Sequence, residues 1–250
     1  MTTPRHDTSI TLGWMRDGEL FFARQLAAVP DPDLDGPSAL PGWNRRTLLA
    51  HVARNAEALA RLLSWARTGV ETPMYADAAQ RAREIEISSR QPADDLRADV
   101  RRTATALGEA AARLSAGQWQ AAVRSARGRE IPAAEVPWMR CREVWLHGLD
   151  LSAGAVPGDI PEAFAEVLVD DVAEFMSAQP ALPATEIVSS SDDRRWRVGG
   201  ADHAAGPEDL TRRPPEVRGD PRTLALWLTG RGYDRRALSA EDLPPLPGWL

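Results

Sequence analysis

Apolar residues recur every three to four positions along most of the first 155 residues, which is the spacing of one face of an α-helix. This pattern predicts four long helices joined by connections of moderate length. Their expected bounds are Ile10 to Ala28, Asn44 to Thr68, Asp94 to Ser115 and Ala134 to Ala153. Asn44 is expected to cap the second helix, and Gly69 to end it. A further segment, 76–87, is predicted as a shorter helix or an ordered loop.

Four helices of this length favour a bundle, an architecture that commonly builds metal sites from side chains on facing helices. After Pro157-Gly158 the pattern changes to one helix, several short strand-like runs and a last short helix. The expected bounds are Pro161 to Ala178 and Thr223 to Thr229 for these helices, and 185–189, 195–198, 209–212 and 216–219 for the strands. The sequence therefore predicts a mainly α protein with two domains, a four-helix bundle at 1–155 and a small α+β domain at 158–250.

The composition is that of a folded protein without a basic surface. Hydrophobic residues make up 43% of the 250 residues, and the net charge of -6 argues against binding to nucleic acid or to an anionic membrane. No run of about 18 apolar residues occurs, and the one cysteine, Cys141, suits a reducing compartment. We therefore expect a cytoplasmic, monomeric protein without nucleic-acid or membrane partners. All 30 basic residues are arginine, which excludes a Schiff-base lysine.

Glu143 and His147 form the most informative pair in the chain. They are four residues apart in a predicted helix, so both side chains lie on one face, one turn apart. Of the three other histidines, His51 lies in the second predicted helix, whereas His6 and His203 lie in polar segments and are treated as bystanders. Two histidines and one glutamate from two facing helices make a zinc site that keeps an open position, which is the catalytic type.

Less specific interpretations stay open from the residues alone. Glu143 and His147 can be an ordinary solvated pair on one helix, and His51 can be a hydrogen-bonded core histidine. Cys141 is an alternative catalytic group, as a nucleophile beside His147. Helical geometry, however, turns Cys141 about 120° away from His147 and about 200° away from Glu143. We therefore expect Cys141 to be a buried structural thiol.

Four segments carry a resemblance to a known family. Two of them contain the candidate ligands. One follows the second predicted helix, and one is a Gly-Arg-Gly triplet that follows the last predicted helix. The residues are Met139-Arg140-x-Arg142-Glu143-Val144-Trp145-x-His147 with Asp150-Leu151, Gly42-Trp43 with Thr47 and His51-Val52-Ala53-x-Asn55-Ala56, Thr68-Gly69-x-Glu71-Thr72-Pro73-Met74-Tyr75, and Gly230-Arg231-Gly232. Together they resemble the mycothiol-dependent maleylpyruvate isomerases. The segments occur in order from about residue 40 to residue 232, so the resemblance covers most of the chain.

The resemblance implies a DinB-like four-helix bundle followed by an α+β domain. It also implies a zinc ion held by the residues that match His51, Glu143 and His147. Mycothiol, a low-molecular-weight thiol, is the implied cosubstrate. Its thiolate adds to a double bond of maleylpyruvate, allows rotation and leaves, which gives fumarylpyruvate.

The implied substrate is a small dicarboxylate, and in a chain without lysine its cationic partners must be arginines. Arg231 matches the functional arginine of the family and is expected to be catalytic. Arg81 and Arg142 are weaker candidates for substrate binding. Two other functions remain open: another mycothiol S-transferase on the same zinc site, or a zinc-containing binding protein without catalysis.

Overall fold

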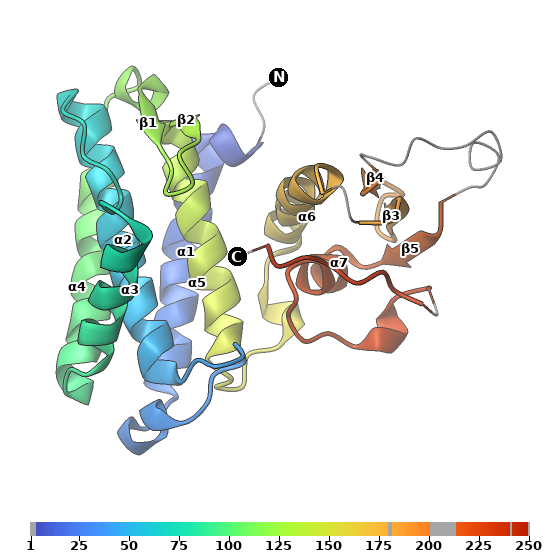
Figure 1. The fold of residues 1–250 in the computed structure, drawn as a ribbon, viewed down its shortest axis with the longest axis horizontal. Coiled ribbons are helices and arrows are strands. Elements are labelled where there is room, and N and C mark those ends of the chain that lie inside the picture. Colours follow the sequence, from blue (N-terminus) through green and yellow to red (C-terminus); the bar gives the residue numbers. More distant parts are fainter. Residues whose placement is uncertain (1–3, 180–181, 201–213, 241, 250) are drawn as a thin grey trace. The chain divides into compact units, whose positions relative to one another are not determined.

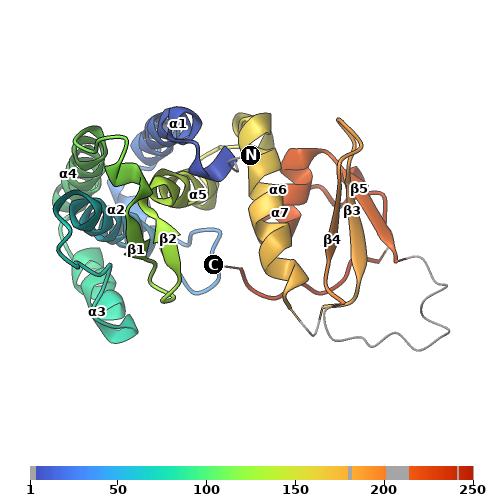
Figure 2. The same cartoon turned by 90° about the horizontal axis from the view of Figure 1, so that it is seen from above.

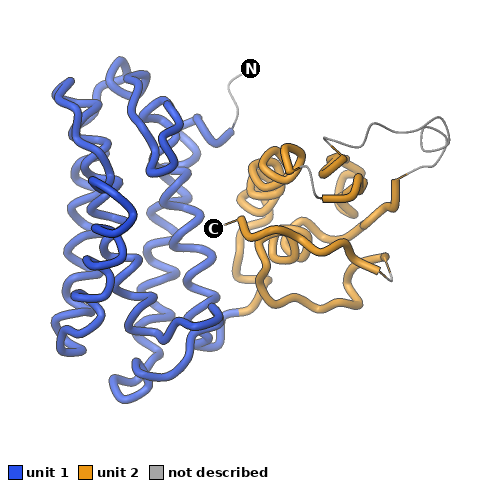
Figure 3. Tube along the Cα trace, viewed as in Figure 1, with its two compact units in different colours: residues 1–155 blue, residues 156–250 orange. Residues whose placement is uncertain are grey.

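The computed structural model of the chain describes residues 4–179, 182–200, 214–240 and 242–249 (Figure 1). The chain divides into two compact units, Met1–Ala155 and Val156–Leu250 (Figure 3). The first unit contains α1 (Thr8–Ala27), α2 (Arg45–Thr68), α3 (Ala78–Ser89), α4 (Ala93–Ala112), β1 (Ala122–Arg124), β2 (Glu130–Pro132) and α5 (Val136–Asp150). The second contains α6 (Glu162–Ser177), β3 (Thr185–Ser189), β4 (Arg195–Val198), β5 (Glu216–Gly219) and α7 (Pro221–Leu228).

The four predicted long helices are α1, α2, α4 and α5, and they form a four-helix bundle (Figures 1 and 2). In this bundle α2 packs against α4 and α5, and α1 packs against α5. Leu49, Leu59 and Leu62 of α2 and Phe21 of α1 are among the buried side chains of its core. Each such side chain stabilises the fold by about 1.5–3 kcal/mol when it leaves water. None of the described helices is long and apolar enough to cross a bilayer.

The start and end of α2 follow the predicted capping chemistry. The side-chain oxygen of Asn44 accepts a hydrogen bond from the backbone N–H of Thr47 at 2.9 Å, which satisfies one of the free donors of the first turn. Gly69 ends the helix with φ of 73°, a left-handed conformation that costs glycine little. His51 therefore lies in the second turn of a helix whose start is fixed by its cap.

Two local elements go beyond the sequence prediction. The segment predicted as a shorter helix or an ordered loop is the helix α3. It is capped by Asp77, whose carboxylate accepts a hydrogen bond from the Gln80 N–H at 2.6 Å. The short antiparallel hairpin of β1 and β2, which precedes α5, was not predicted. Its strands have three residues each, which is too short to show an alternating pattern in the sequence.

The second unit is a small α+β structure. Its sheet has the order β4-β3-β5, in which β3 pairs antiparallel with β4 and parallel with β5. Figure 2 shows α6 and α7 against one face of this sheet. The predicted strand at 209–212 lies outside the described residues. The mainly helical fold with a smaller α+β part agrees with the prediction.

A fully buried arginine joins three helices of the bundle. Arg140 of α5 is 0% exposed and pairs with Glu19 of α1 through Nε at 2.7 Å and Nη2 at 3.3 Å. Its Nη1 donates to the Val52 carbonyl at 2.8 Å and to the Asn55 side-chain oxygen at 3.0 Å, both on α2. Val52 follows His51 directly, so these bonds tie α5 to α2 next to a candidate metal ligand.

Candidate metal centre

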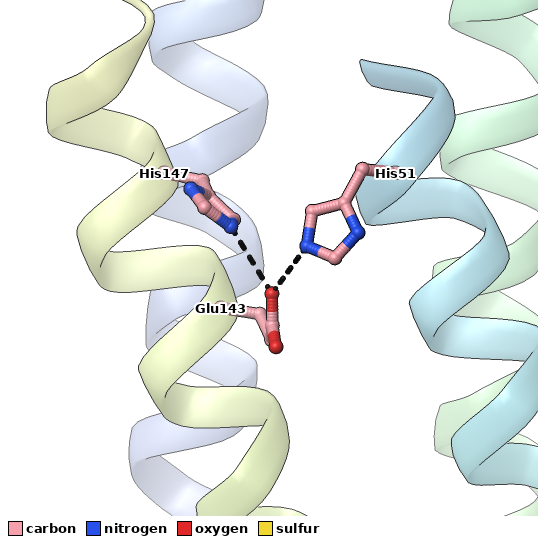
Figure 4. A group of neighbouring side chains, drawn as sticks. All are labelled: His51, Glu143 and His147. Atoms are coloured by element: carbon pink, nitrogen blue, oxygen red, sulfur yellow. Dashed lines mark hydrogen bonds and ion pairs between the residues drawn. The ribbon is translucent and has the colours of Figure 1, made fainter. Parts of the chain in front are cut away.

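The structure brings the three predicted ligands together. The Oε2 atom of Glu143 lies 2.8 Å from Nε2 of His51 and 3.1 Å from Nε2 of His147 (Figure 4). One ligand atom from each residue can be chosen so that all lie within 4.8 Å of one another. Glu143 and His147 come from one face of α5, and His51 faces them from α2 (Figure 4). The pair on α5 is therefore part of a group that joins two helices.

The group is withdrawn from solvent. His51 and His147 are 6% and 4% exposed, and the Glu143 side chain is 13% exposed. Burial of this kind is costly for ionised groups unless they are paired. The interpretation of Glu143 and His147 as a solvated surface pair is therefore wrong.

The three side chains of the group shift one another's pKa values. Burial lowers the pKa of the His51 imidazole, and this effect exceeds the opposing attraction of Glu143. Burial also disfavours the charged form of His147, but hydrogen bonds to Asp150 and Glu143 outweigh it and raise the pKa of this imidazole. Burial alone would raise the pKa of Glu143, yet the two facing histidines hold it well below its usual value. Glu143 is therefore an anion at neutral pH, as a metal ligand must be.

Each histidine has a further partner at its second ring nitrogen. Nδ1 of His147 lies 2.8 Å from Oδ2 of Asp150, a buried carboxylate one turn further along α5. This carboxylate would hold the ring proton on Nδ1 when a metal takes the Nε2 lone pair, which is the usual outer arrangement of a metal-binding histidine. Nδ1 of His51 lies 3.2 Å from Nη2 of Arg81. Since a guanidinium only donates, Nδ1 accepts in this contact, and Nε2 carries the ring proton and donates it to Glu143. A metal at Nε2 needs the lone pair there, so metal binding would move the ring proton to Nδ1 and end this contact with Arg81.

The donor set fits zinc. Two imidazole nitrogens and one carboxylate are the protein ligands of a catalytic zinc site, which keeps a fourth position for a small molecule. The buried Glu143 anion offsets part of the charge of a divalent ion. Trp43 packs its ring edge-on against His51, with 5.4 Å between ring centroids, and restricts the orientation of that imidazole.

The three predicted arginines differ in where they lie. Arg81, on α3, contacts the ligand group, with its Nη2 3.2 Å from Nδ1 of His51. Arg142 precedes Glu143 in α5, and neighbouring helical residues point about 100° apart, so its side chain leaves the ligand face. Arg231 belongs to the second unit and follows α7, where its Nη1 donates to the Thr229 carbonyl at 2.8 Å.

The remaining histidines are not part of the described ligand group. Nε2 of His6 lies 3.1 Å from Oε2 of Glu135, a buried carboxylate just before α5. His6 thus has a structural partner outside the ligand group. His203 lies outside the described residues.

The prediction for Cys141 is confirmed. The thiol is buried and its Sγ donates to the Thr11 carbonyl of α1 at 3.4 Å, on a different side of α5 from Glu143 and His147. Burial raises the pKa of this thiol strongly, which suppresses the reactive thiolate.

We expect Cys141→Ala to retain full metal content and full turnover, because the thiol touches neither ligand. In the folded wild-type protein a thiol reagent should label Cys141 far more slowly than in urea. Labelling is followed by absorbance and located by mass spectrometry. Equal rates in the folded and the unfolded protein would contradict the buried position.

Three polar residues near the group were missed by the sequence reasoning. Asp150 lies three residues after His147, and this helical spacing was a signal that could have identified it. Tyr75 lies in the connection between α2 and α3, and Arg61 lies in α2 with its guanidinium 5.7 Å from the Tyr75 ring centroid. No helical spacing in the sequence connects Tyr75 and Arg61 to the ligands, because Tyr75 lies in a loop whose course the sequence pattern does not predict.

Comparisons with known proteins show the family of the chain. The family model of the mycothiol maleylpyruvate isomerase N-terminal domain matches residues 15–152, which is more than half of the chain and contains all three candidate ligands. Two crystal structures are similar over 100% of this chain and 100% of theirs, each with 33% sequence identity and a TM-score of 0.88. One is of a mycothiol-dependent maleylpyruvate isomerase, and the other is of a histidine-to-alanine mutant of such an enzyme. No curated protein sequence matches the chain.

Proposed function

Because the chain belongs to the mycothiol-dependent maleylpyruvate isomerase family, we propose that it isomerises maleylpyruvate to fumarylpyruvate on a zinc site. His51, Glu143 and His147 are the proposed ligands. The observation that carries the proposal is the convergence of two imidazoles and one carboxylate, from two facing helices, within 4.8 Å. Zinc, when bound, lowers the pKa of a coordinated thiol and so supplies a thiolate at neutral pH.

The residues of the chain prepare this chemistry. Asp150 holds the proton of His147 on Nδ1, so that Nε2 faces the centre of the group. Glu143 supplies one negative charge, which keeps a bound thiolate more nucleophilic than an all-neutral ligand set would. The bundle buries the ligands, and burial strengthens each electrostatic interaction there.

The proposed reaction is a reversible addition. The mycothiol thiolate forms a C–S bond to one carbon of the substrate double bond, and the electron pair moves into the adjacent carbonyl as an enolate. The former double bond is now single and rotates. The enolate then returns its electrons, the C–S bond breaks, and the thiolate is released with the trans product.

The test is an absorbance assay of maleylpyruvate with zinc-loaded protein, with and without mycothiol. We expect turnover only when both the metal and the thiol are present. Without turnover the isomerase proposal fails, and consumption of mycothiol by an electrophile would then identify an S-transferase. If neither reaction occurs and zinc is bound, the protein is a zinc-containing binding protein.

Arg231 is the proposed clamp for a substrate carboxylate or for the enolate. We expect Arg231→Ala to lower kcat/KM by roughly 100-fold, because a charged donor to the developing anion is lost. Zinc content should not change, since Arg231 is not a ligand. The control is Arg236→Ala, an exposed arginine nearby, which should behave as wild type. Unchanged activity of Arg231→Ala would remove the proposed role.

A further inference from the structure

Arg61 is a charged side chain with two donor atoms, Nε and Nη2, that have no hydrogen-bond partner within the described part of the chain. It lies in α2 and is partly buried. Its Nε and Nη2 atoms are shielded from solvent, and neither has a hydrogen-bond partner among the described residues. Buried donors are nearly always paired in folded proteins, and a charged donor left unpaired is especially costly. An anionic ligand would satisfy both donors.

Tyr75 connects Arg61 to the metal group. The Arg61 guanidinium lies 5.7 Å from the centroid of the Tyr75 ring. Burial raises the pKa of the Tyr75 hydroxyl, and Arg81, Glu143, Arg61 and Glu84 each act on it electrostatically. Arg61 is therefore the charged group in direct contact with the ring, and the other three act on the hydroxyl through their electric fields. Arg81 also contacts His51, so one of the charges that act on this phenol lies against the ligand group.

Charged groups of both signs act on Tyr75. Arg61 and Arg81 carry two positive charges, and Glu84 supplies one negative charge. Glu84 uses its Oε1 to accept from the Gln80 side chain at 2.8 Å, and the direct hydrogen bonds described for it do not include either arginine. Glu143 belongs to the metal group. A carboxylate at this position would satisfy the unpartnered Nε and Nη2 donors of Arg61, and guanidinium groups bind carboxylates with paired hydrogen bonds.

We propose that Arg61, Tyr75 and Arg81 form a carboxylate subsite beside the metal group, and that it binds one carboxylate of the dicarboxylate substrate. This assignment rests on the proposed function for the identity of the ligand. The guanidiniums of Arg61 and Arg81 supply the charge, and the Tyr75 hydroxyl supplies a third donor. The subsite orients the substrate chain relative to the metal, and it distinguishes dicarboxylates from monocarboxylates.

The test measures binding of maleate and of crotonate, a monocarboxylate of the same chain length, to the zinc-loaded full-length protein by calorimetry. The wild type should prefer maleate. Arg61→Met should weaken maleate binding about 10- to 100-fold and leave crotonate binding unchanged. Arg61→Lys should lie between the two. The matched control, Arg67→Met, replaces an exposed arginine at the end of the same helix and should bind as wild type.

Tyr75→Phe provides a second variant with a minimal change of volume, for the case that Arg61→Met does not fold. It should weaken maleate binding several-fold with full zinc content, because only one donor is lost. Equal preference for maleate in wild type, Arg61→Met and Tyr75→Phe would overturn the subsite. Because the measurement needs neither mycothiol nor turnover, its outcome is separate from that of the isomerase assay. A protein that isomerises maleylpyruvate with unchanged KM in Arg61→Lys and Tyr75→Phe would also overturn it.

Discussion

Replacement of His51, Glu143 or His147 by alanine is expected to remove the metal and to abolish mycothiol-dependent turnover. Each variant leaves two of three protein ligands, and the loss should exceed the roughly 10- to 100-fold that removal of an outer partner of a ligand costs in metal affinity. Glu143→Ala also removes the anion that both imidazoles face. Metal analysis after gel filtration measures the stoichiometry, and the absorbance assay measures turnover.

The matched control for these variants is His6→Ala, because His6 is a histidine of the same unit with a carboxylate partner outside the group. It should retain one metal ion per chain and normal turnover. Full zinc in any one of the three ligand variants would exclude that residue as a ligand. A wild-type protein that binds no metal would contradict the proposed site as a whole.

Arg140→Met is expected to produce the largest loss of stability among single arginine replacements in the bundle. It leaves Glu19 without its buried partner and the Val52 carbonyl and Asn55 side chain without a donor. Breaking a buried ion pair by removing one partner costs about 3–5 kcal/mol. Urea unfolding followed by circular dichroism measures this loss as a fall in the free energy of unfolding. Glu19→Met combined with Arg140→Met should recover part of it, because no unpaired charge then remains.

Arg90→Ala is the control for the loss of an arginine charge at an exposed position. Arg90 pairs with Glu86 across one turn of α3, and both side chains are largely exposed, at 74% and 62%. Exposed pairs of this kind contribute about 0–1 kcal/mol. If Arg140→Met were as mild as Arg90→Ala, the three-helix connection would not stabilise the bundle.

Much of the fold could be predicted from the spacing of apolar residues along the chain. The four long helices, the α6 helix and the strands β3, β4 and β5 lie close to their predicted positions. Binary patterns predict such elements because each buries one face, and the pattern repeats over several turns or along a strand. The β1–β2 hairpin was missed because its strands are too short to show an alternating pattern. The choice of helix for α3 had a local signal, Asp77 with Gln80 three residues later, which the apolar periodicity does not register. The cytoplasmic location and the monomeric state stay predictions.

The sequence by itself determined that Glu143 and His147 share a face of one helix and that Cys141 does not, because the helical rotation per residue settles both. Only the tertiary structure decided that His51 meets them across the bundle, since the packing of α2 against α5 sets that distance. It likewise decided that Asp150 holds His147, that Arg61 lies against the Tyr75 ring, and that Arg81 lies against His51. Contacts between side chains far apart in sequence depend on how helices pack, and a single-chain pattern does not contain that information.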